Sequence, residues 1–279
     1  MTGKLTRVLQ QRLRVARESR GLRQLPSMPC GSHALRPLTV ADLAKIFNSL
    51  DILREWQRKE PHLKRACPIE DGRTGGVNPG DRRAVWYLVY GLGARSVLEI
   101  GTHVGASTLH IAAALQKHTS SSSVRPQLVT VDIQDVNSEV SGYWKQYGLS
   151  ASPRDMIRSI ECGDFVRFAA QPSLEFLDNC TDTFDLIFLD GDHAATTVYQ
   201  EIPRALKALN ENGVLLLHDY FPHNRPLWTN GSFVPGPYVA TARLQREGVP
   251  IEVIPLGDLP WPTKEGSRTT SLAVVTRLH

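Results

Sequence analysis

Ser96-Val-Leu-Glu-Ile-Gly-Thr-His-Val-Gly-Ala-Ser107 has the pattern of a buried strand, a glycine turn and the start of a helix. Ser96 to Ile100 is a short apolar run, and the residues that follow as far as Lys117 place apolar side chains at helical spacing. Gly101 and Gly105 lack a Cβ, so the main chain can bend sharply and a ligand can lie directly against it. The helix opening near Ser107 offers free N–H groups to a carboxylate. The stretch therefore predicts a nucleotide-type pocket.

Segments with strand and helix patterns alternate after this turn. Alternation of this kind predicts an α/β fold, in which a mostly parallel sheet is covered by helices on both faces. Ligands of such sheets bind beyond the carboxyl ends of the strands at the switch point of the strand order, which here lies next to the first strand. The predicted strands are 127–132, 157–161, 185–190, 213–218, 250–255 and 271–277, and the predicted helices are about 195–209 and 238–247.

The first eighty residues predict a helical segment in front of this domain. An apolar stripe predicts a first helix, and the proline-rich residues 24–37 predict a linker or hinge. Thr39 is expected to cap a helix through about Gln57, residues 60–80 to form a loop, and a helix from Asp81 to end at Gly93. We therefore divide the chain into residues 1–80, a lid or oligomerisation segment, and residues 81–279, the catalytic domain. The stripe consists of Leu5, Val8, Leu9, Leu13 and Ala16.

Length and composition set the broad class. With 279 residues, 41% of them hydrophobic, the chain is long enough for one large α/β domain and an accessory segment. We find no run of membrane-spanning length and no secretory signal, so we expect a cytoplasmic protein without a membrane partner. The four cysteines show no C-x-x-C pairing, which predicts ordinary reduced thiols.

The net charge of +4 is unevenly distributed. Residues 1–36 carry one lysine and seven arginines against one glutamate, a balance of +7, which leaves −3 for the rest of the chain. A basic arm can bind nucleic acid or an acidic membrane surface, or act as an organelle-targeting segment. Because the arm also carries the apolar stripe, we favour a packing or homo-oligomer-forming helix over a nucleic-acid arm.

A carboxylate follows the second predicted strand. Leu128-Val-Thr-Val-Asp132 ends an apolar run with an acid, and an acid at that place can accept hydrogen bonds from both ribose hydroxyls. The preceding run directs it into the same crevice as Gly101. We therefore interpret Asp132 as a ribose-binding residue rather than as a strand-terminal cap.

The glycine spacing identifies the kind of nucleotide. Glu99-x-Gly101-x-x-x-Gly105 differs from the G-x-G-x-x-G fingerprint, which disfavours NAD. It resembles motif I of the class I S-adenosylmethionine-dependent methyltransferases, and the resemblance covers roughly residues 80 to 278. The resemblance implies a Rossmann-like sheet of seven strands in the order 3-2-1-4-5-7-6, with S-adenosylmethionine as cofactor and Glu99 helping to order the glycine turn.

A second family motif implies the adenine site. Cys162-Gly163-Asp164-Phe165, placed after the third predicted strand, resembles the motif in which a carboxylate meets the adenine amino group and its neighbours enclose the ring. The resemblance thus implies that Asp164 and Phe165 bind cofactor. A simple helix N-cap is the alternative role of Asp164.

Ionisable residues end two further predicted strands. Phe184-Asp-Leu-Ile-Phe-Leu-Asp190-Gly-Asp192-His193 and Gly213-Val-Leu-Leu-Leu-His218-Asp219-Tyr220 are apolar runs of this kind. Adjacent strand ends would bring Asp190 and Asp219 face to face, and two close carboxylates repel unless they share a proton or a cation. Oxygen-rich ligation predicts Mg²⁺, with Mn²⁺ or Ca²⁺ as alternatives.

His193, three residues after Asp190, is placed to remove the proton of a substrate hydroxyl. A cap of the following helix is its alternative role. The combination of D-G-D-H and H-D-Y resembles the metal-dependent O-methyltransferases of the catechol-type and antibiotic-sugar branch. That branch usually has a pair such as Asp-Asp, Glu-Asp or Asp-Asn where this chain has His218-Asp219. The third metal ligand is therefore His218, Asp192 or water, or else the metal is absent.

The loop between Phe221 and Tyr238 predicts the acceptor region. Its Trp228 and Phe233 can stack on an aromatic ring or a sugar face, or pack under the loop. The favoured function is methyl transfer to a hydroxyl of a small molecule such as a natural product, sugar or phenol. Two alternatives are an RNA or protein methyltransferase that uses the basic arm, and a cofactor-binding protein with other chemistry. The negative balance of the catalytic domain argues against nucleic acid.

Overall fold

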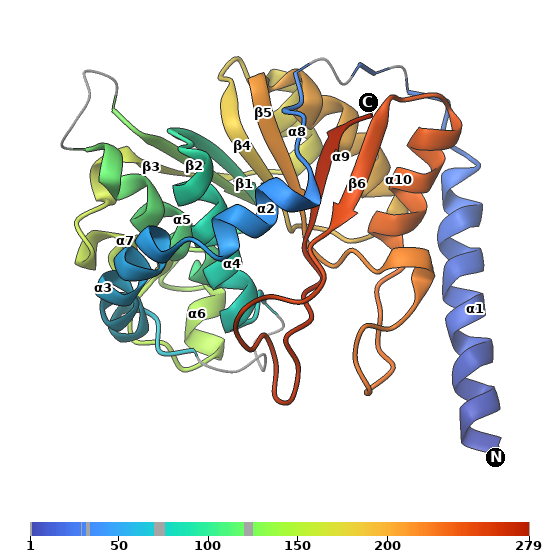
Figure 1. Cartoon of the computed structure of the whole chain (residues 1–279), viewed down its shortest axis with the longest axis horizontal. Coiled ribbons are helices and arrows are strands. Elements are labelled where there is room, and N and C mark those ends of the chain that lie inside the picture. Colours follow the sequence, from blue (N-terminus) through green and yellow to red (C-terminus); the bar gives the residue numbers. More distant parts are fainter. Residues whose placement is uncertain (1, 29, 32–33, 70–75, 120–124, 279) are drawn as a thin grey trace.

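A seven-stranded sheet in the order β3-β2-β1-β4-β5-β7-β6 forms the centre of the computed structural model (Figure 1). The structure describes residues 2–28, 30–31, 34–69, 76–119 and 125–278, with side chains from Leu9 onward. Strands β1 to β5 are parallel, and β7 runs antiparallel to both β5 and β6. The predicted strand order is confirmed. The strands are β1 Ser96–Ile100, β2 Gln127–Asp132, β3 Val166–Ala170, β4 Phe184–Leu189, β5 Leu209–Leu217, β6 Ile251–Pro255 and β7 Ala273–Arg277.

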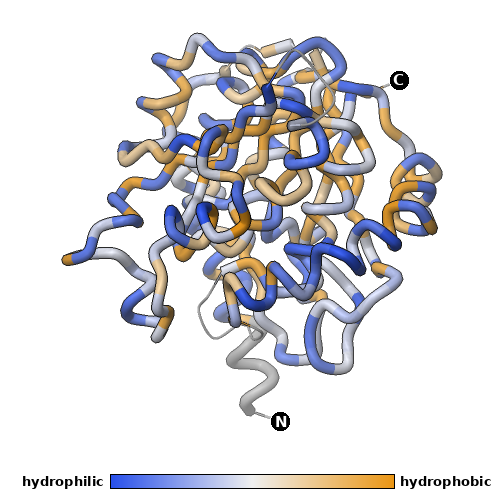
Figure 2. Tube along the Cα trace, turned by 90° about the vertical axis from the view of Figure 1, so that its left-hand side faces the viewer, coloured by the Kyte–Doolittle hydropathy of each residue, from blue (hydrophilic) through white to orange (hydrophobic). Residues whose placement is uncertain are grey.

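Helices cover both faces of this sheet, as the alternating pattern predicts. Successive buried residues of one strand belong to opposite cores: Val97 packs in the core beneath α4 and α5, whereas Leu98 packs in the core beneath α9 and α10. Figure 2 shows hydrophobic residues concentrated along the interior of the molecule. The helices are α1 Thr2–Leu22, α2 Val40–Phe47, α3 Leu50–Ala66, α4 Pro79–Leu92, α5 Ala106–Leu115, α6 Tyr143–Gln146, α7 Pro153–Ser159, α8 Ser173–Asn179, α9 Ala195–Lys207 and α10 Gly236–Arg246.

The N-terminal segment is packed into both cores. Helix α1 lies against α9 and α10 (Figure 1), and Leu22 and Leu35 are buried beside residues of those helices. Residues 34–36 add a short parallel bridge to the sheet, since Arg36 N–H donates to Gly213 O at 2.9 Å. On the other face, Phe47 and Trp56 pack against Tyr87 of α4. The division at residue 80 stays a prediction, but the two parts share their hydrophobic cores.

The helix starts of this segment follow local capping rules. Thr39 caps α2 in a capping box with Asp42, as expected, and Gly93 ends α4 in the left-handed conformation. The single helix predicted from Thr39 to about Gln57 is instead two helices, because Ser49 caps a new helix that continues to Ala66. Part of the predicted 60–80 loop is therefore helical.

The third strand was predicted at the wrong place. Residues 157–161 belong largely to helix α7, which begins at Pro153 behind the N-cap Ser152, and this Ser-Pro start favours a helix. The third strand is Val166–Ala170 instead. It is an edge strand that pairs only with β2 in the sheet order, so it needs no continuous apolar run. Its exposed Arg167 interrupts the apolar run that would identify a strand.

Among the described residues, no helix is both long enough and apolar enough to cross a membrane.

Candidate active site

The turn between β1 and α5 depends on two glycines with positive φ. Gly101 has a φ of 102°, and a Cβ at this position would collide with the backbone carbonyl oxygen of Asp190. Gly105 has a φ of 78° and lies against Pro153. Both residues are therefore required by backbone geometry, as the sequence predicts. The Gly101 contact also fixes the end of β1 directly against the end of β4.

Glu99, near the end of β1, holds this turn in place through hydrogen bonds. It is fully buried, and its Oε2 accepts hydrogen bonds from Thr108 Oγ1 at 2.5 Å and Thr130 Oγ1 at 2.7 Å. Burial raises the pKa of Glu99 to about 7, while hydrogen bonds from Ser107 and these two hydroxyls act in the opposite direction. Glu99 and Ser107 tie β1, β2 and α5 together, and neither lines the cavity described next.

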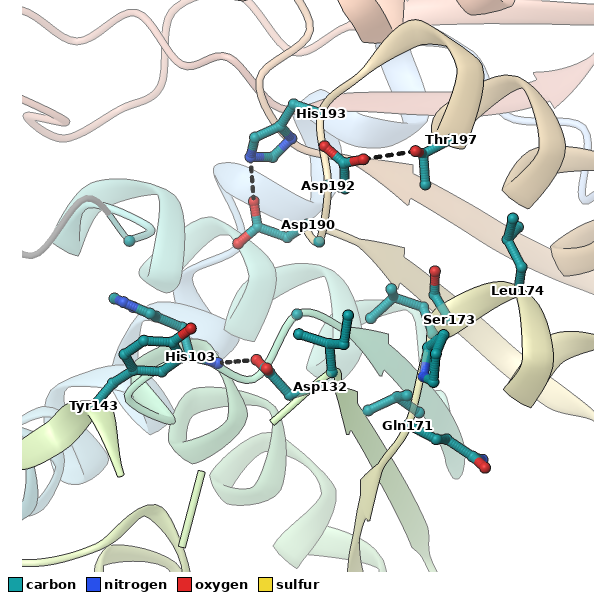
Figure 3. A pocket seen from close by; sticks show the side chains of 17 residues that line it. His103, Asp132, Tyr143, Gln171, Ser173, Leu174, Asp190, Asp192, His193 and Thr197 are labelled. Atoms are coloured by element: carbon teal, nitrogen blue, oxygen red, sulfur yellow. Dashed lines mark hydrogen bonds and ion pairs between the residues drawn. The ribbon is translucent and has the colours of Figure 1, made fainter. Parts of the chain in front are cut away.

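A cavity of about 580 Å³ opens at the carboxyl ends of β1, β2 and β4. Asp132 lies in its wall, where Oδ2 accepts from His103 N–H at 2.9 Å and Oδ1 accepts from Gln134 N–H at 3.1 Å. Each carboxylate oxygen keeps a second lone pair for a ligand. Figure 3 shows Asp132 on the same cavity as Asp190 and His193. The strand ends thus bring together the groups that the sequence places far apart.

The acidic end of the cavity is a cluster of imidazoles and carboxylates. Asp190 Oδ1 lies 2.7 Å from His218 Nδ1 and 3.9 Å from His193 Nε2. Asp219 Oδ2 lies 3.6 Å from His193 Nε2. A fifth member comes from α4, because Asp81 Oδ2 is 3.3 Å from His218 Nε2. The structure thus brings the candidate residues Asp190, His193, His218 and Asp219 together, whereas Asp81 was not among the candidates.

The cluster concentrates charge in a poorly hydrated place. Although burial lowers it, the carboxylates of Asp190 and Asp219 hold the pKa of His218 well above its ordinary value. Burial raises the pKa of Asp219, but His218 and His193 bring it below the ordinary value. The ionised form of Asp219 therefore depends on the positive charge of the two nearby imidazoles.

This donor set is compatible with a metal ion. Asp190, His193 and His218 each offer one ligand atom, and these atoms all lie within 4.8 Å of one another. Asp219 Oδ1 is 3.6 Å from His218 Nδ1, next to the same group. Asp192, the other acid considered as a ligand, instead accepts hydrogen bonds from Ala194 N–H and Thr197 Oγ1.

Asp164 and Phe165 were predicted to follow the third strand, and that placement is wrong. They form a short 3₁₀ turn, Gly163–Phe165, which precedes β3. Because β3 is parallel to β2, this turn lies at the strand edge opposite to Asp132. Asp164 is exposed, and neither residue lines the cavity.

The residues that do follow β3 line the cavity and were not recognised from the sequence. Gln171, Pro172, Ser173 and Leu174 form this wall, and Figure 3 shows Gln171, Ser173 and Leu174 on the side of Asp132. They could have been recognised as cavity residues from their position directly after a strand, but only with the correct assignment of β3. His103 and Tyr143 complete the wall on the other side of Asp132.

Trp228 and Phe233 pack under their own loop. Phe233 is buried, and both rings lie edge-on to Phe221, with ring centroids 5.6 Å and 6.2 Å away. Trp228 Nε1 donates to Thr269 O, and Lys264 lies over its ring. Neither aromatic residue lines the 580 Å³ cavity, so the packing role fits them better than the stacking role.

Known proteins resemble this chain in sequence and in fold. The family model described as a methyltransferase domain matches residues 98–220. The O-methyltransferase hkm8 of Aspergillus hancockii is 24% identical over 163 residues, which cover 56% of this chain and 57% of that protein. The chain thus matches little more than half the length of this curated relative.

Solved structures share the fold at low sequence identity. Cofactor-bound Rv0187 from MTB has a TM-score of 0.52 at 17% identity, with 90% of this chain and 99% of that chain covered. An O-methyltransferase from Bacillus cereus, in complex with SAH, has a TM-score of 0.51 at 21% identity, covering 86% and 98% of the two chains. The sheet order and these matches together show a class I methyltransferase fold.

Proposed function

Because residues 98–220 match the methyltransferase-domain family and the sheet has the class I methyltransferase fold, we propose that the protein is an S-adenosylmethionine-dependent O-methyltransferase that acts on a hydroxyl of a small molecule. One observation carries the proposal: Asp132, Gly101, Asp190 and His193 line a single cavity of about 580 Å³. That volume lies within the range of cofactor and small-molecule sites. A cofactor held at Asp132 therefore reaches the cluster of acids and imidazoles.

The cofactor would lie across the ends of β1 and β2. Asp132 would accept the ribose hydroxyls with the lone pairs that His103 N–H and Gln134 N–H leave free. The main chain at Gly101 would approach the cofactor closely, since glycine itself has no side chain to hold the ligand away. Because Asp164 is exposed at the opposite edge, we assign the adenine side to the segment from Gln171 to Leu174.

The chemical step needs a base beside the acceptor hydroxyl. The acceptor oxygen attacks the methyl carbon, the carbon–sulfur bond breaks, and the sulfonium becomes a neutral thioether. The hydroxyl proton passes to the imidazole of His193, which lies in the cavity wall with 31% of its side chain exposed. Asp219 Oδ2, 3.6 Å from His193 Nε2, would stabilise the imidazolium that forms.

A divalent cation would be held by Asp190, Asp219 and His218. Asp190 Oδ1 and Asp219 Oδ1 lie 2.7 Å and 3.6 Å from His218 Nδ1. When bound, a cation in this place supplies positive charge that favours the ionised form of an acceptor hydroxyl. The chain's own residues position it, since both acids come from strand ends fixed by the sheet. EDTA is expected to abolish turnover and added divalent metal to restore it; full activity after exhaustive chelation would exclude this part of the proposal.

Calorimetry with S-adenosylhomocysteine tests the cofactor site. Asp132→Ala removes two charge-assisted hydrogen bonds, each contributing about 1.5–3 kcal/mol where buried, so we expect affinity to fall by about 10²- to 10⁴-fold. Asp164→Ala is the matched control, because Asp164 lies at the opposite strand edge, and it should bind normally. Equal affinities in both variants would refute the placement.

A further inference from the structure

We infer that His218 is an imidazole ligand of the active-site cation, oriented by Asp81, and that the site therefore selects a first-row transition ion such as Mn²⁺ or Co²⁺ over Mg²⁺. The inference rests on the proposed function for the presence of a cation at Asp190 and Asp219. It adds the residue that orients the His218 ligand and the class of metal.

The two ring nitrogens of His218 face different acids. Nδ1 is 2.7 Å from Asp190 Oδ1 and 3.6 Å from Asp219 Oδ1, so it points at the space between the two acids. Nε2, on the far side of the ring, is 3.3 Å from Asp81 Oδ2. Histidines that bind metal usually donate the other ring N–H to a carboxylate in this way, which fixes the tautomer and the orientation of the ring.

Asp81 is built into the fold as the partner of this histidine. It lies in the first turn of α4, 137 residues before His218, and its side chain is fully buried. Oδ2 also accepts a hydrogen bond from Asn78 Nδ2 at 2.6 Å, and Oδ1 has no hydrogen-bond partner among the described residues. A buried carboxylate is costly unless positive charge balances it. A cation bound through His218 would provide that balance.

The donor types determine the metal. Mg²⁺ prefers a shell of oxygen ligands, whereas imidazole nitrogen favours first-row transition ions. The sequence predicts an oxygen-rich site and hence Mg²⁺, but the structure directs a nitrogen of His218 at the point where Asp190 and Asp219 converge. Mn²⁺ and Co²⁺ accept both carboxylate and imidazole donors.

His193 lies within 4.8 Å of the ligand atoms of Asp190 and His218, but its distances and exposure suit a base better than a fixed ligand. Its Nε2 lies 3.9 Å from Asp190 Oδ1 and 3.6 Å from Asp219 Oδ2, both longer than the 2.7 Å contact of His218. Its side chain is 31% exposed, against 9% for His218. Exposure to the cavity suits a residue that exchanges a proton with the acceptor, and burial suits a fixed ligand.

Metal binding to the chelator-stripped full chain tests the inference without any turnover. We expect Mn²⁺ to bind at least about tenfold more tightly than Mg²⁺, and pulsed EPR of the Mn²⁺-loaded protein to show coupling to ¹⁴N. His218→Asn should abolish this coupling and reduce the Mn²⁺ preference, whereas His193→Ala should preserve both. Asp81→Asn should weaken Mn²⁺ binding by about 10- to 100-fold. Asp258→Asn, an exposed acid whose Oδ1 accepts a hydrogen bond from Thr269 Oγ1, is the matched control and should bind normally.

Thermal stabilisation by S-adenosylhomocysteine, measured in parallel, shows that each variant is folded and keeps its cofactor site. Coupling to ¹⁴N that persists in His218→Asn, wild-type Mn²⁺ affinity in Asp81→Asn, or a wild-type protein that binds no metal would each overturn the inference. Loss of the cofactor response in the wild-type protein would instead count against the proposed methyl transfer, so the two failures are distinguishable.

Discussion

At the residue scale, His193 is the group whose chemistry matters most for turnover. It contacts the cavity, and its Nε2 faces Asp219 rather than a main-chain group. We expect His193→Ala to lower kcat by about 10²- to 10⁴-fold, because a positioned general base contributes a factor of that size, while affinity for S-adenosylhomocysteine is unchanged. His62→Ala, an exposed histidine of α3, is the control. Wild-type kcat in His193→Ala would show that another group takes the proton.

The buried carboxylate of Glu99 predicts how the stability of the fold depends on pH. The pKa of Glu99 in the fold is about 7, above its ordinary value of 4.5, because burial favours the neutral acid. The folded state therefore binds more protons than the unfolded state between these pH values, so the contribution of Glu99 to stability is full below pH 4.5 and is lost as pH rises through about 7.

Glu99→Gln keeps a neutral side chain of the same shape and removes this titration. We expect the unfolding free energy of the wild type, relative to this variant, to fall by about 3 kcal/mol at most between pH 4.5 and 7. Denaturant titrations at several pH values measure the difference. Glu175→Gln, at an exposed position of α8, should show little change, and a flat difference curve for Glu99→Gln would contradict the assignment.

At the element scale, the turn between β1 and α5 holds the site together. A methyl group at Gly101 would collide with the carbonyl oxygen of Asp190, which neither strand can move without breaking its pairing. We expect Gly101→Ala to destabilise the fold by several kcal/mol, because a collision adds to the cost of a positive φ. Gly148→Ala separates the two costs, since Gly148 has a φ of 72° and an added Cβ would meet no atom of the described residues within 4 Å. It should lose only about 1–2 kcal/mol, and similar losses in both variants would argue against the collision.

At the scale of the whole molecule, the N-terminal segment is part of the folding unit. Leu22 and Leu35 are 2% and 0% exposed, and Glu18 accepts a hydrogen bond from Ala195 N–H at the start of α9. Removal of residues 1–36 should therefore destabilise the protein by several kcal/mol, since loss of each buried leucine costs about 2–5 kcal/mol. Removal of residues 1–16 leaves these contacts and should keep the thermal midpoint close to that of the full chain.

Size-exclusion chromatography of the shorter truncation tests the second predicted role of this segment. Leu9 and Leu13 on α1 are 59% and 60% exposed, which leaves an apolar stripe for a subunit contact. An unchanged oligomeric state after removal of residues 1–16 would exclude such a contact. An unchanged thermal midpoint after removal of residues 1–36 would contradict the role in the core.

Short-range patterns in the sequence determined the sheet, the glycine turn and the positions of Asp132 and Asp190. Each of these follows from a few neighbouring residues: an apolar run defines a strand, and the polar residue that ends it must lie at the carboxyl edge of a parallel sheet. The edge strand β3 could not be located in this way, because a strand with only one neighbour needs no continuous apolar run. The wrong position of this strand also led to the wrong position of Asp164.

Only the tertiary structure decided which polar groups meet. Asp81 contacts His218, 137 residues later in the chain, because α4 packs against the sheet. No local pattern in either segment predicts that contact. The same holds for the wall from Gln171 to Leu174, which depends on the true position of β3, and for Trp228, which packs on Phe221 instead of lining the cavity. Local periodicity specifies elements, whereas the direction of a side chain at their junctions is set by the packing of elements distant in the sequence.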